Sequence, residues 1–124
     1  MCGIFGFVEA GPRAKAASLA DLEEGMSRIR HRGPDGEGTW VSDNGQVGLS
    51  HVRLSIIDLS ESAAQPMASD DGRYVMTYNG EVYNYIELRA ELGAHRFNTS
   101  SDSEVILRAF ETWGADCVRR LRGM

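Results

Sequence analysis

The sequence predicts one mixed α and β domain, and three observations lead to this fold class. Its 124 residues are 42% hydrophobic and 25% charged, which is the balance of a soluble globular protein. Short apolar runs bounded by turn residues are typical of strands, whereas apolar residues at spacings of three and four are typical of helices. A chain of this length buries roughly two thirds of its surface on folding, enough for one core. We therefore expect one domain, or part of one.

The first strand and the first helix are expected in the N-terminal thirty residues. Residues 4–8 are apolar, β-branched or aromatic, and the Glu-Ala-Gly-Pro run at 9–12 ends them, which indicates a buried strand. A helix is predicted over about residues 16–30, because four apolar residues recur there at helical spacing. These residues are Leu19, Leu22, Met26 and Ile29.

A loop and three strands are predicted next. Residues 31–36, His-Arg-Gly-Pro-Asp-Gly, are turn-forming and end the helix. Residues 39–41 and 46–51 flank a Ser-Asp-Asn-Gly turn, and its Asn-Gly pair favours a tight antiparallel hairpin. Residues 73–78 are rich in Tyr, Val, Met and Thr, which indicates another strand.

The C-terminal part of the chain is predicted to be helical. Asn84 is expected to cap one helix. Residues 101–104, Ser-Asp-Ser-Glu, form a capping-box pattern before a longer helix that is expected to end at Gly114. A short helix is predicted over residues 117–121. Two aromatic residues of the longer helix, Phe110 and Trp113, are expected in the core.

Composition and motifs argue against several function classes. The formal net charge of −5 argues against a nucleic-acid-binding surface. The apolar runs are far shorter than the roughly 20 residues that span a bilayer, and no secretion leader is recognised, so we expect a cytoplasmic protein away from membranes. The cysteines and histidines lack metal-ligand spacing, and no phosphate-binding glycine loop occurs. Neither a metal nor a cofactor is therefore expected in this segment.

Cys2 is a candidate nucleophile because it follows the initiator methionine. Removal of Met1 would leave the Cys2 thiol beside its own α-amino group. A thiol pKa of about 8.5 and an α-amine pKa of about 7.7–8.0 lie close enough for proton exchange, so one residue can supply nucleophile and base. On position alone, the more common role is that of a small residue leading a strand.

Four other residues have both a structural and a functional interpretation. Asn79 and Gly80 form either a plain turn or an oxyanion hole, to which they contribute a side-chain amide and a backbone N–H. Arg53 is either a solvated arginine or a partner for a substrate carboxylate. Asp102 either supports the start of its helix or accepts from a substrate ammonium group. Considered alone, each residue favours the structural role.

Five motifs occur in a recognisable order. They are MCGIFG at 1–6, HRGPD at 31–35, HVRLSIID at 51–58, YNGEVYN at 78–84 and SDSEVIL at 101–107. Together they resemble the class II glutamine amidotransferase domain of glutamine-hydrolysing asparagine synthetases. Because the resemblance runs from Met1 to Met124, residues 1–124 are predicted to be part of one such domain.

The resemblance implies an α+β fold, the four-layer αββα sandwich of N-terminal-nucleophile hydrolases with antiparallel sheets, incomplete here at the C-terminus. It implies that Cys2 attacks the glutamine side-chain amide and that Asn79 and Gly80 form the oxyanion hole. The implied substrate-binding residues hold the glutamine α-carboxylate, through Arg53 and neighbouring backbone, and the α-ammonium group, through two carboxylates. They are Arg53, Leu54, Ser55, Ile56, Ile57, Glu81 and Asp102.

The implied function is to supply ammonia to an ATP-dependent asparagine synthetase domain, which would bind aspartate, ATP and magnesium and has no counterpart in these residues. Two alternatives stay open. One is an amidotransferase with another acceptor, in a polysaccharide or natural-product pathway, and the other is a non-catalytic glutamine-binding or assembly module. The oligomeric state is also open, with a homodimer as one option. The isolated chain is expected to be unstable, because missing strands leave apolar faces and sheet edges uncovered.

Overall fold

The computed structural model describes residues 2–10 and 18–124 of the chain. These residues divide into two compact units. The first comprises Met1–Ser55, Ala64–Pro66 and Thr77–Asn79, and the second comprises Ile56–Ala63, Met67–Met76 and Gly80–Met124. The described elements are antiparallel strands and helices, which confirms the predicted α+β class. The four-layer αββα sandwich stays a prediction.

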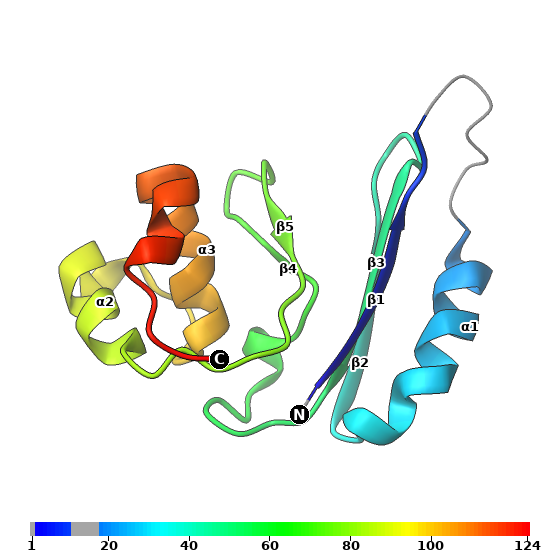
Figure 1. The fold of residues 1–124 in the computed structure, drawn as a ribbon, viewed down its shortest axis with the longest axis horizontal. Coiled ribbons are helices and arrows are strands. Elements are labelled where there is room, and N and C mark those ends of the chain that lie inside the picture. The colour runs from blue at the N-terminus through cyan, green and yellow to red at the C-terminus, as the bar shows by residue number, and fades with distance from the viewer. Residues whose placement is uncertain (1, 11–17) are drawn as a thin grey trace. The chain divides into compact units, whose positions relative to one another are not determined.

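The first unit contains a three-stranded antiparallel sheet with a helix on one face (Figure 1). Its strands β1 (Gly3–Val8), β2 (Gly36–Val41) and β3 (Val47–Arg53) lie in the order β1-β3-β2. The predicted hairpin between β2 and β3 is confirmed, and Gly45 in its turn has a φ of 67°, which favours glycine. This topology brings the start of β1 beside the end of β3, where Gly3 pairs with Val52.

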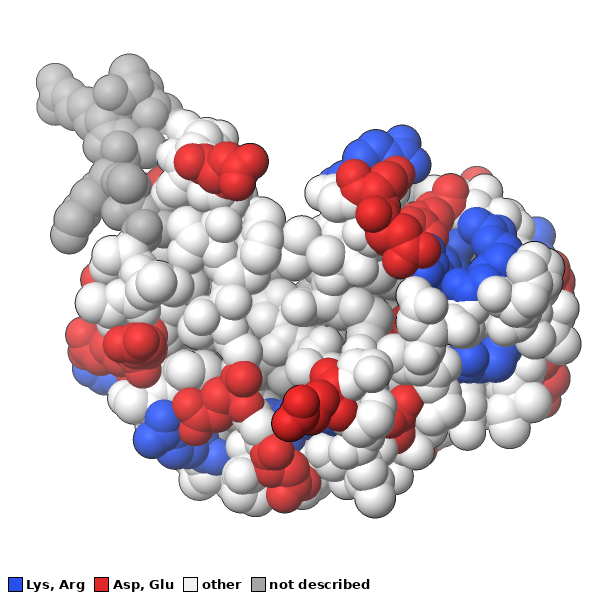
Figure 2. Space-filling model, turned by 180° about the vertical axis from the view of Figure 1, so that it is seen from behind, with Lys and Arg blue, Asp and Glu red and all other residues white. Residues whose placement is uncertain are grey.

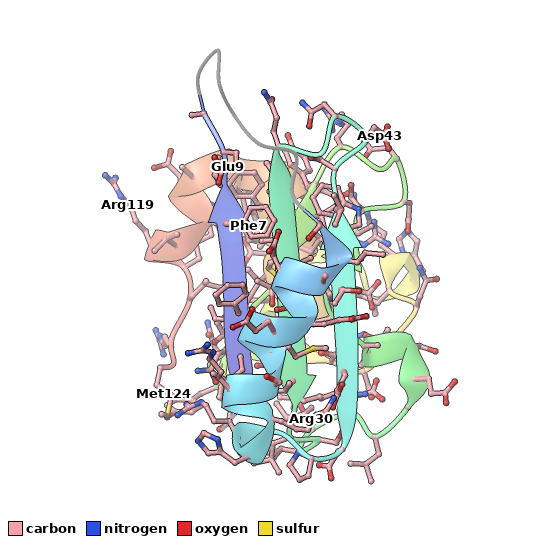
Figure 3. All side chains as sticks on the ribbon, turned by 90° about the vertical axis from the view of Figure 1, so that its right-hand side faces the viewer. Phe7, Glu9, Arg30, Asp43, Arg119 and Met124 are labelled. Atoms are coloured by element: carbon pink, nitrogen blue, oxygen red, sulfur yellow. The ribbon has the colours of Figure 1, made fainter. Side chains whose placement is uncertain are left out.

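Helix α1 (Leu19–Ile29) lies across the sheet in Figure 3. Leu22 is fully buried. Its side chain and the ring of Phe7 in β1 both lie next to Gly48 of β3. A Cβ at Gly48 would lie 2.6 Å from the Phe7 ring. The absence of a side chain at this position of β3 therefore lets the helix and the aromatic ring pack closely on the sheet.

Two sequence-based predictions for this unit are wrong in part. The first strand is not buried, since Ile4 is 47% and Val8 73% exposed. Among the described residues β1 pairs only with β3, so it is an edge strand of the three-stranded sheet. In α1, Leu19 is 56% exposed, one turn before the buried Leu22. The predicted helix start at residue 16 lies outside the described residues.

The second unit contains a small hairpin and two packed helices. Its elements are β4 (Met67–Ala68), β5 (Val75–Met76), α2 (Tyr85–Leu92) and α3 (Asp102–Trp113). The predicted strand at 73–78 is thus confirmed only over two residues. The predicted end of the longer helix at Gly114 is confirmed, and a 3₁₀ helix over Gly114–Arg119 replaces the short helix predicted for 117–121.

Two side chains of the second unit differ from prediction for tertiary reasons. Asn84 does not cap α2 with its side chain. Its amide instead donates to the Arg120 carbonyl at 3.0 Å and accepts from the Arg122 N–H at 2.8 Å. Phe110 is 38% exposed and packs edge-on against Tyr74, with ring centroids 5.1 Å apart, so it lies at the border of the core.

Charged side chains of both signs are mixed over the surface. On the face in Figure 2, arginine side chains lie beside Asp and Glu side chains. Surface ion pairs include Arg28 with Glu24 at 2.7 Å and Arg120 with Glu91 at 2.6 Å. Such exposed pairs contribute little to stability. Among the described residues, no helix combines the length and the apolar composition needed to cross a membrane.

His51 is a titratable residue in the middle strand of the first sheet. It is 1% exposed, and its Nε2 has no hydrogen-bond partner among the described residues. Burial lowers the pKa of His51 below its usual 6.5, and the nearby Arg53 charge lowers it further, against the opposing effect of a hydrogen bond to the Tyr78 backbone. The imidazole is therefore held in its neutral form in the folded chain.

This lowered pKa predicts a specific loss of stability in acid. Unfolded chains bind a proton at His51 below pH about 6.5, whereas the folded chain does so only at lower pH, so the contribution is complete above that pH and is lost as the pH falls. We expect the free energy of unfolding of the natural full-length protein to fall more between pH 7.5 and 5.5 than that of a His51→Gln variant, measured by urea titration.

The exposed His31 provides a matched control for this comparison. A His31→Gln variant should lose as much stability on acidification as the unaltered protein. An equal loss in the His51→Gln variant would contradict the account of His51.

Candidate active site

Cys2 lies immediately before β1, beside the residue that follows β3. The Leu54 N–H donates to the Cys2 Sγ at 3.3 Å, and the thiol in turn donates to the Leu54 carbonyl at 3.6 Å. The side chain is half-buried and forms no disulfide. The backbone of residue 54 therefore holds the thiol at the end of the sheet, in a position open to partial solvent contact.

The loop after α1 holds the backbone of Cys2. The Arg32 Nε donates to the Cys2 carbonyl at 2.9 Å. The preceding and following turns bring the loop against β3, and Gly33 makes the closest approach. A Cβ at Gly33 would lie 2.5 Å from backbone atoms of Val52 and Arg53. Its φ of −153° is open to any residue, so the requirement for glycine is one of space.

Asp35 continues this contact with the end of β3. Its N–H donates to the Arg53 carbonyl at 2.9 Å, and its carboxylate accepts from the Ser55 N–H at 2.8 Å. These two bonds lie on either side of Leu54, whose backbone contacts the Cys2 thiol. The 31–35 loop therefore fixes both Cys2 and the segment that contacts it.

Asn79 also belongs to the first unit, and a buried glutamine holds the residue before it. The Gln65 Oε1 accepts from the Tyr78 N–H at 2.6 Å, and Gln65 is 8% exposed. The Asn79 side chain itself is half-buried. This hydrogen bond fixes the backbone of Tyr78 and so restricts the position of Asn79. A side-chain amide that acts as an oxyanion-hole donor needs such a restricted position.

In the second unit, Asp102 opens α3 and is 7% exposed. Its Oδ2 accepts from the Val82 N–H at 2.9 Å. The capping role is carried by Ser101, whose Oγ accepts from the Ser103 N–H at 3.0 Å. The helix therefore begins with a serine cap, and the carboxylate of Asp102 is directed to the 81–83 segment instead.

Residues 81–83 are held in an extended conformation by the C-terminal residues of the chain. The Glu81 N–H donates to the Met124 carbonyl at 2.9 Å, and the Met124 N–H donates to the Glu81 carbonyl at 3.0 Å. Val82 pairs with Gly123 as an antiparallel bridge. Glu81 directly precedes Val82, whose N–H donates to Asp102.

The residues predicted to form the site fall into both units. The first unit holds Cys2, Arg53, Leu54, Ser55 and Asn79, and the second holds Ile56, Ile57, Gly80, Glu81 and Asp102. Within the first unit the structure brings Cys2 together with Leu54. Within the second it brings Asp102 to the residue after Glu81.

Three residues that organise these positions received no role from the sequence. They are Arg32, Asp35 and Asp58, the last of which accepts hydrogen bonds from Ser60 and Ser100. All three lie inside the motifs at 31–35 and 51–58, on which the resemblance rests. Their place in these motifs is the feature of the sequence that could have indicated a role. Arg32 contacts Cys2, Asp35 contacts Ser55 and Asp58 contacts Ser100. These partners lie 30, 20 and 42 residues away along the chain, beyond the reach of local pattern analysis.

Cys117, the second cysteine, has the properties of a buried structural thiol. It is 2% exposed, and burial raises the pKa of its thiol, which disfavours the reactive thiolate. Cys2 is therefore the better-placed nucleophile of the two cysteines.

Among residues 2–10 and 18–124, no group of three or more His, Cys, Asp or Glu side chains is arranged to hold a metal ion.

Comparison with known proteins bears on what this arrangement does. Asparagine synthetase [glutamine-hydrolyzing] 1 of Bacillus subtilis is 42% identical over 127 residues, which cover 100% of this chain and 20% of that protein. The protein of the same name from Arabidopsis thaliana is 42% identical over 124 residues, with the same coverage. The Gibberella zeae protein Amidase chry2 is 39% identical over 132 residues, covering 99% of this chain and 20% of its own length.

The chain thus spans about one fifth of the length of the curated relatives that it matches. A family described as the glutamine amidotransferase domain matches residues 1–124. The match covers the whole chain, including the motifs that contain Cys2, Arg53, Asn79 and Asp102. The chain therefore belongs to the glutamine amidotransferase domain family and is homologous to the N-terminal region of glutamine-hydrolysing asparagine synthetases.

Proposed function

We propose that this chain hydrolyses the side-chain amide of glutamine with an N-terminal cysteine and supplies the ammonia to a synthetase. The observation that carries the proposal is the position of Cys2. Its thiol is held by the Leu54 backbone at the end of β3, where β1 begins beside it. After removal of Met1, the same residue would carry a thiol and a free α-amino group.

The first chemical step is attack of the Cys2 sulfur on the amide carbon of glutamine. The thiol proton passes to the Cys2 α-amine as the S–C bond forms, which gives a tetrahedral oxyanion. The Asn79 side-chain amide and the Gly80 N–H are assigned as the donors that stabilise this oxygen. Collapse of the intermediate breaks the C–N bond, and the leaving nitrogen takes the proton from the α-amine and departs as ammonia.

The second step is hydrolysis of the glutamyl thioester on Cys2. The α-amine, now neutral again, accepts a proton from water as the water oxygen attacks the thioester carbon. Cleavage of the C–S bond releases glutamate, and the sulfur recovers its proton. One residue therefore acts as nucleophile and as general base and acid through both steps.

Recognition of glutamine is assigned to groups of opposite charge at its two ends. The Arg53 guanidinium matches the planar geometry of the α-carboxylate, and the backbone of Leu54 to Ile57 adds further polar groups. Glu81 and Asp102 supply carboxylates for the α-ammonium group. Asp102 has one described donor, the Val82 N–H on Oδ2, and this bond orients the carboxylate.

The relatives are about five times as long as the region that they share with this chain. We propose that a further domain activates aspartate with ATP and magnesium and uses the ammonia to form asparagine, in the cytoplasm. The names of the bacterial and plant relatives support this acceptor. Formation of asparagine from aspartate, ATP and glutamine by the natural full-length protein distinguishes it from other acceptors.

A second candidate keeps the glutaminase chemistry with another acceptor. It is favoured by the Gibberella zeae relative, which has similar identity and the name amidase. A third candidate is a module that binds glutamine without turnover. Glutamine binding without glutamate release by the mature protein would favour this third function over the first two.

The N-terminal cysteine mechanism predicts that glutaminase activity depends on an unblocked Cys2. One extra residue before Cys2 converts the α-amine to an amide, which cannot accept a proton. We expect glutamate release by the full-length protein to fall by at least about 1,000-fold, as it should in Cys2→Ala, because the covalent route is lost. Glutamate release with each form of the N-terminus checks this.

A Cys117→Ala variant is the matched control, because it removes the other thiol and leaves the N-terminus intact. It should retain full activity. Equal activity of the mature and extended forms would contradict the role of the α-amine.

The assignment of Arg53 predicts a loss of glutamine recognition in Arg53→Gln. A hydrogen-bonded charge of this kind contributes about 1.5–3 kcal/mol, so kcat/KM for glutamine should fall roughly 10- to 100-fold. Arg30→Gln serves as the control, because Arg30 is a solvent-exposed arginine of the same unit that pairs with Glu37. Steady-state kinetics that show the same small effect for both variants would refute the assignment.

A further inference from the structure

Asp58 is a buried carboxylate that joins two segments of the second unit. It is 8% exposed. One oxygen, Oδ1, accepts from the Ser60 N–H at 2.8 Å and the Ser60 hydroxyl at 2.6 Å. The other, Oδ2, accepts from the Ser100 N–H at 2.7 Å and the Ser100 hydroxyl at 2.8 Å. The two serines are 40 residues apart in sequence, so the carboxylate is a long-range link.

These hydrogen bonds keep Asp58 ionised. Donation by Ser60 and Ser100 holds the pKa of its carboxyl well below the usual range, although burial opposes this shift. A buried carboxylate is retained only where donors compensate for the lost water. Asp58 therefore acts as a fixed acceptor between the two segments over the whole physiological pH range.

The segment on the Ser100 side leads directly into Asp102. Hydrogen bonds to two side chains restrain the backbone of this segment. Glu104 accepts from the N–H groups of Asn98 and Thr99 at distances of 2.7 to 3.1 Å. Arg89 donates to the carbonyls of Thr99 and Ser101 at 2.7 and 3.2 Å. Any displacement at Ser100 is therefore transmitted to the start of α3.

The segment on the Ser60 side begins with Ile56 and Ile57, whose backbone is assigned to glutamine binding. Asp58 follows them directly. Its carboxylate thus links two parts of the proposed glutamine site. One is the backbone of residues 56–57, and the other is the start of α3, which carries Asp102. Both ends of this link lie in one compact unit.

We propose that Asp58 is a positioning residue for glutamine recognition, which sets the distance between Asp102 and the backbone of residues 56–57. The inference rests on the proposed glutaminase function and adds a residue to it. Asp58 acts through Asp102 and does not touch the reacting atoms. Its loss should therefore weaken binding of the α-ammonium group and leave the chemistry at Cys2 unchanged.

Asp58→Asn is the variant that separates these effects. The asparagine amide has one acceptor oxygen and an NH₂ group, so one of the two serines would face a donor instead of an acceptor. Two substrates are compared in the natural full-length protein, L-glutamine and glutaramate, which is glutamine without its α-amino group. We expect KM for glutamine to rise roughly 10-fold with kcat within about twofold, and kinetics with glutaramate to stay unchanged.

Asp71→Asn is a matched control in the same unit. The Asp71 carboxylate also accepts from a serine hydroxyl, that of Ser69 at 2.8 Å, and from a backbone N–H, that of Arg73 at 3.1 Å. It holds the turn between β4 and β5, which carries none of the proposed site residues. Kinetics with both substrates should match those of the unaltered protein.

Three further variants complete the test. Asp102→Asn should raise KM for glutamine selectively, and addition of Asp58→Asn to it should cause little further change, because both act on one interaction. Ser100→Ala removes a hydroxyl donor and retains the backbone N–H, so it should cause a smaller change in the same direction. This variant carries the test if Asp58→Asn fails to fold.

The outcomes separate this inference from the function on which it rests. No glutamate release by the mature, unaltered protein would overturn the proposed function and this inference with it. Selective loss of glutamine binding in Asp102→Asn, combined with equal losses for glutamine and glutaramate in Asp58→Asn or Ser100→Ala, would overturn the inference alone.

Discussion

The close approach of the 31–35 loop to the end of β3 is the constraint on which the candidate active site depends. At Gly33 the backbone of the loop lies so close to Val52 and Arg53 that no Cβ fits between them. This contact places Arg32 within hydrogen-bond distance of the Cys2 carbonyl. The proposed nucleophile, Cys2, is held by such contacts. Sheet pairing, the arginine and the Leu54 backbone together supply that restraint.

The second unit uses carboxylates for the same purpose. Just before α3, the N–H groups of Thr99 and Ser100 donate to the carboxylates of Glu104 and Asp58. These hydrogen bonds restrain the segment that leads into α3. The proposed recognition of the α-ammonium group by Asp102 would benefit from this restraint, because a carboxylate already held in position loses little freedom on binding.

Local chemistry explains which parts of the structure could be predicted from the sequence. The Asn44-Gly45 hairpin and the helix end at Gly114 depend on backbone preferences of a few adjacent residues, and both predictions are confirmed. Capping by Asn84 fails because two distant backbone groups compete for its amide. For the site, motif order indicated the residue types and the family. The contacts of Arg32 and Asp58 required the folded chain, since they join segments far apart in sequence.

The proposed function requires a covalent glutamyl intermediate on Cys2, and an experiment that traps this intermediate is the most informative one. The natural full-length protein, with Met1 removed, is mixed with glutamine, quenched in acid within the first turnovers, digested and analysed by mass spectrometry. We expect a glutamyl group on the N-terminal peptide, attached as a thioester that hydroxylamine removes, and none on the peptide containing Cys117. Steady turnover with an unmodified Cys2, or with the glutamyl group on another residue, would rule out Cys2 as the nucleophile.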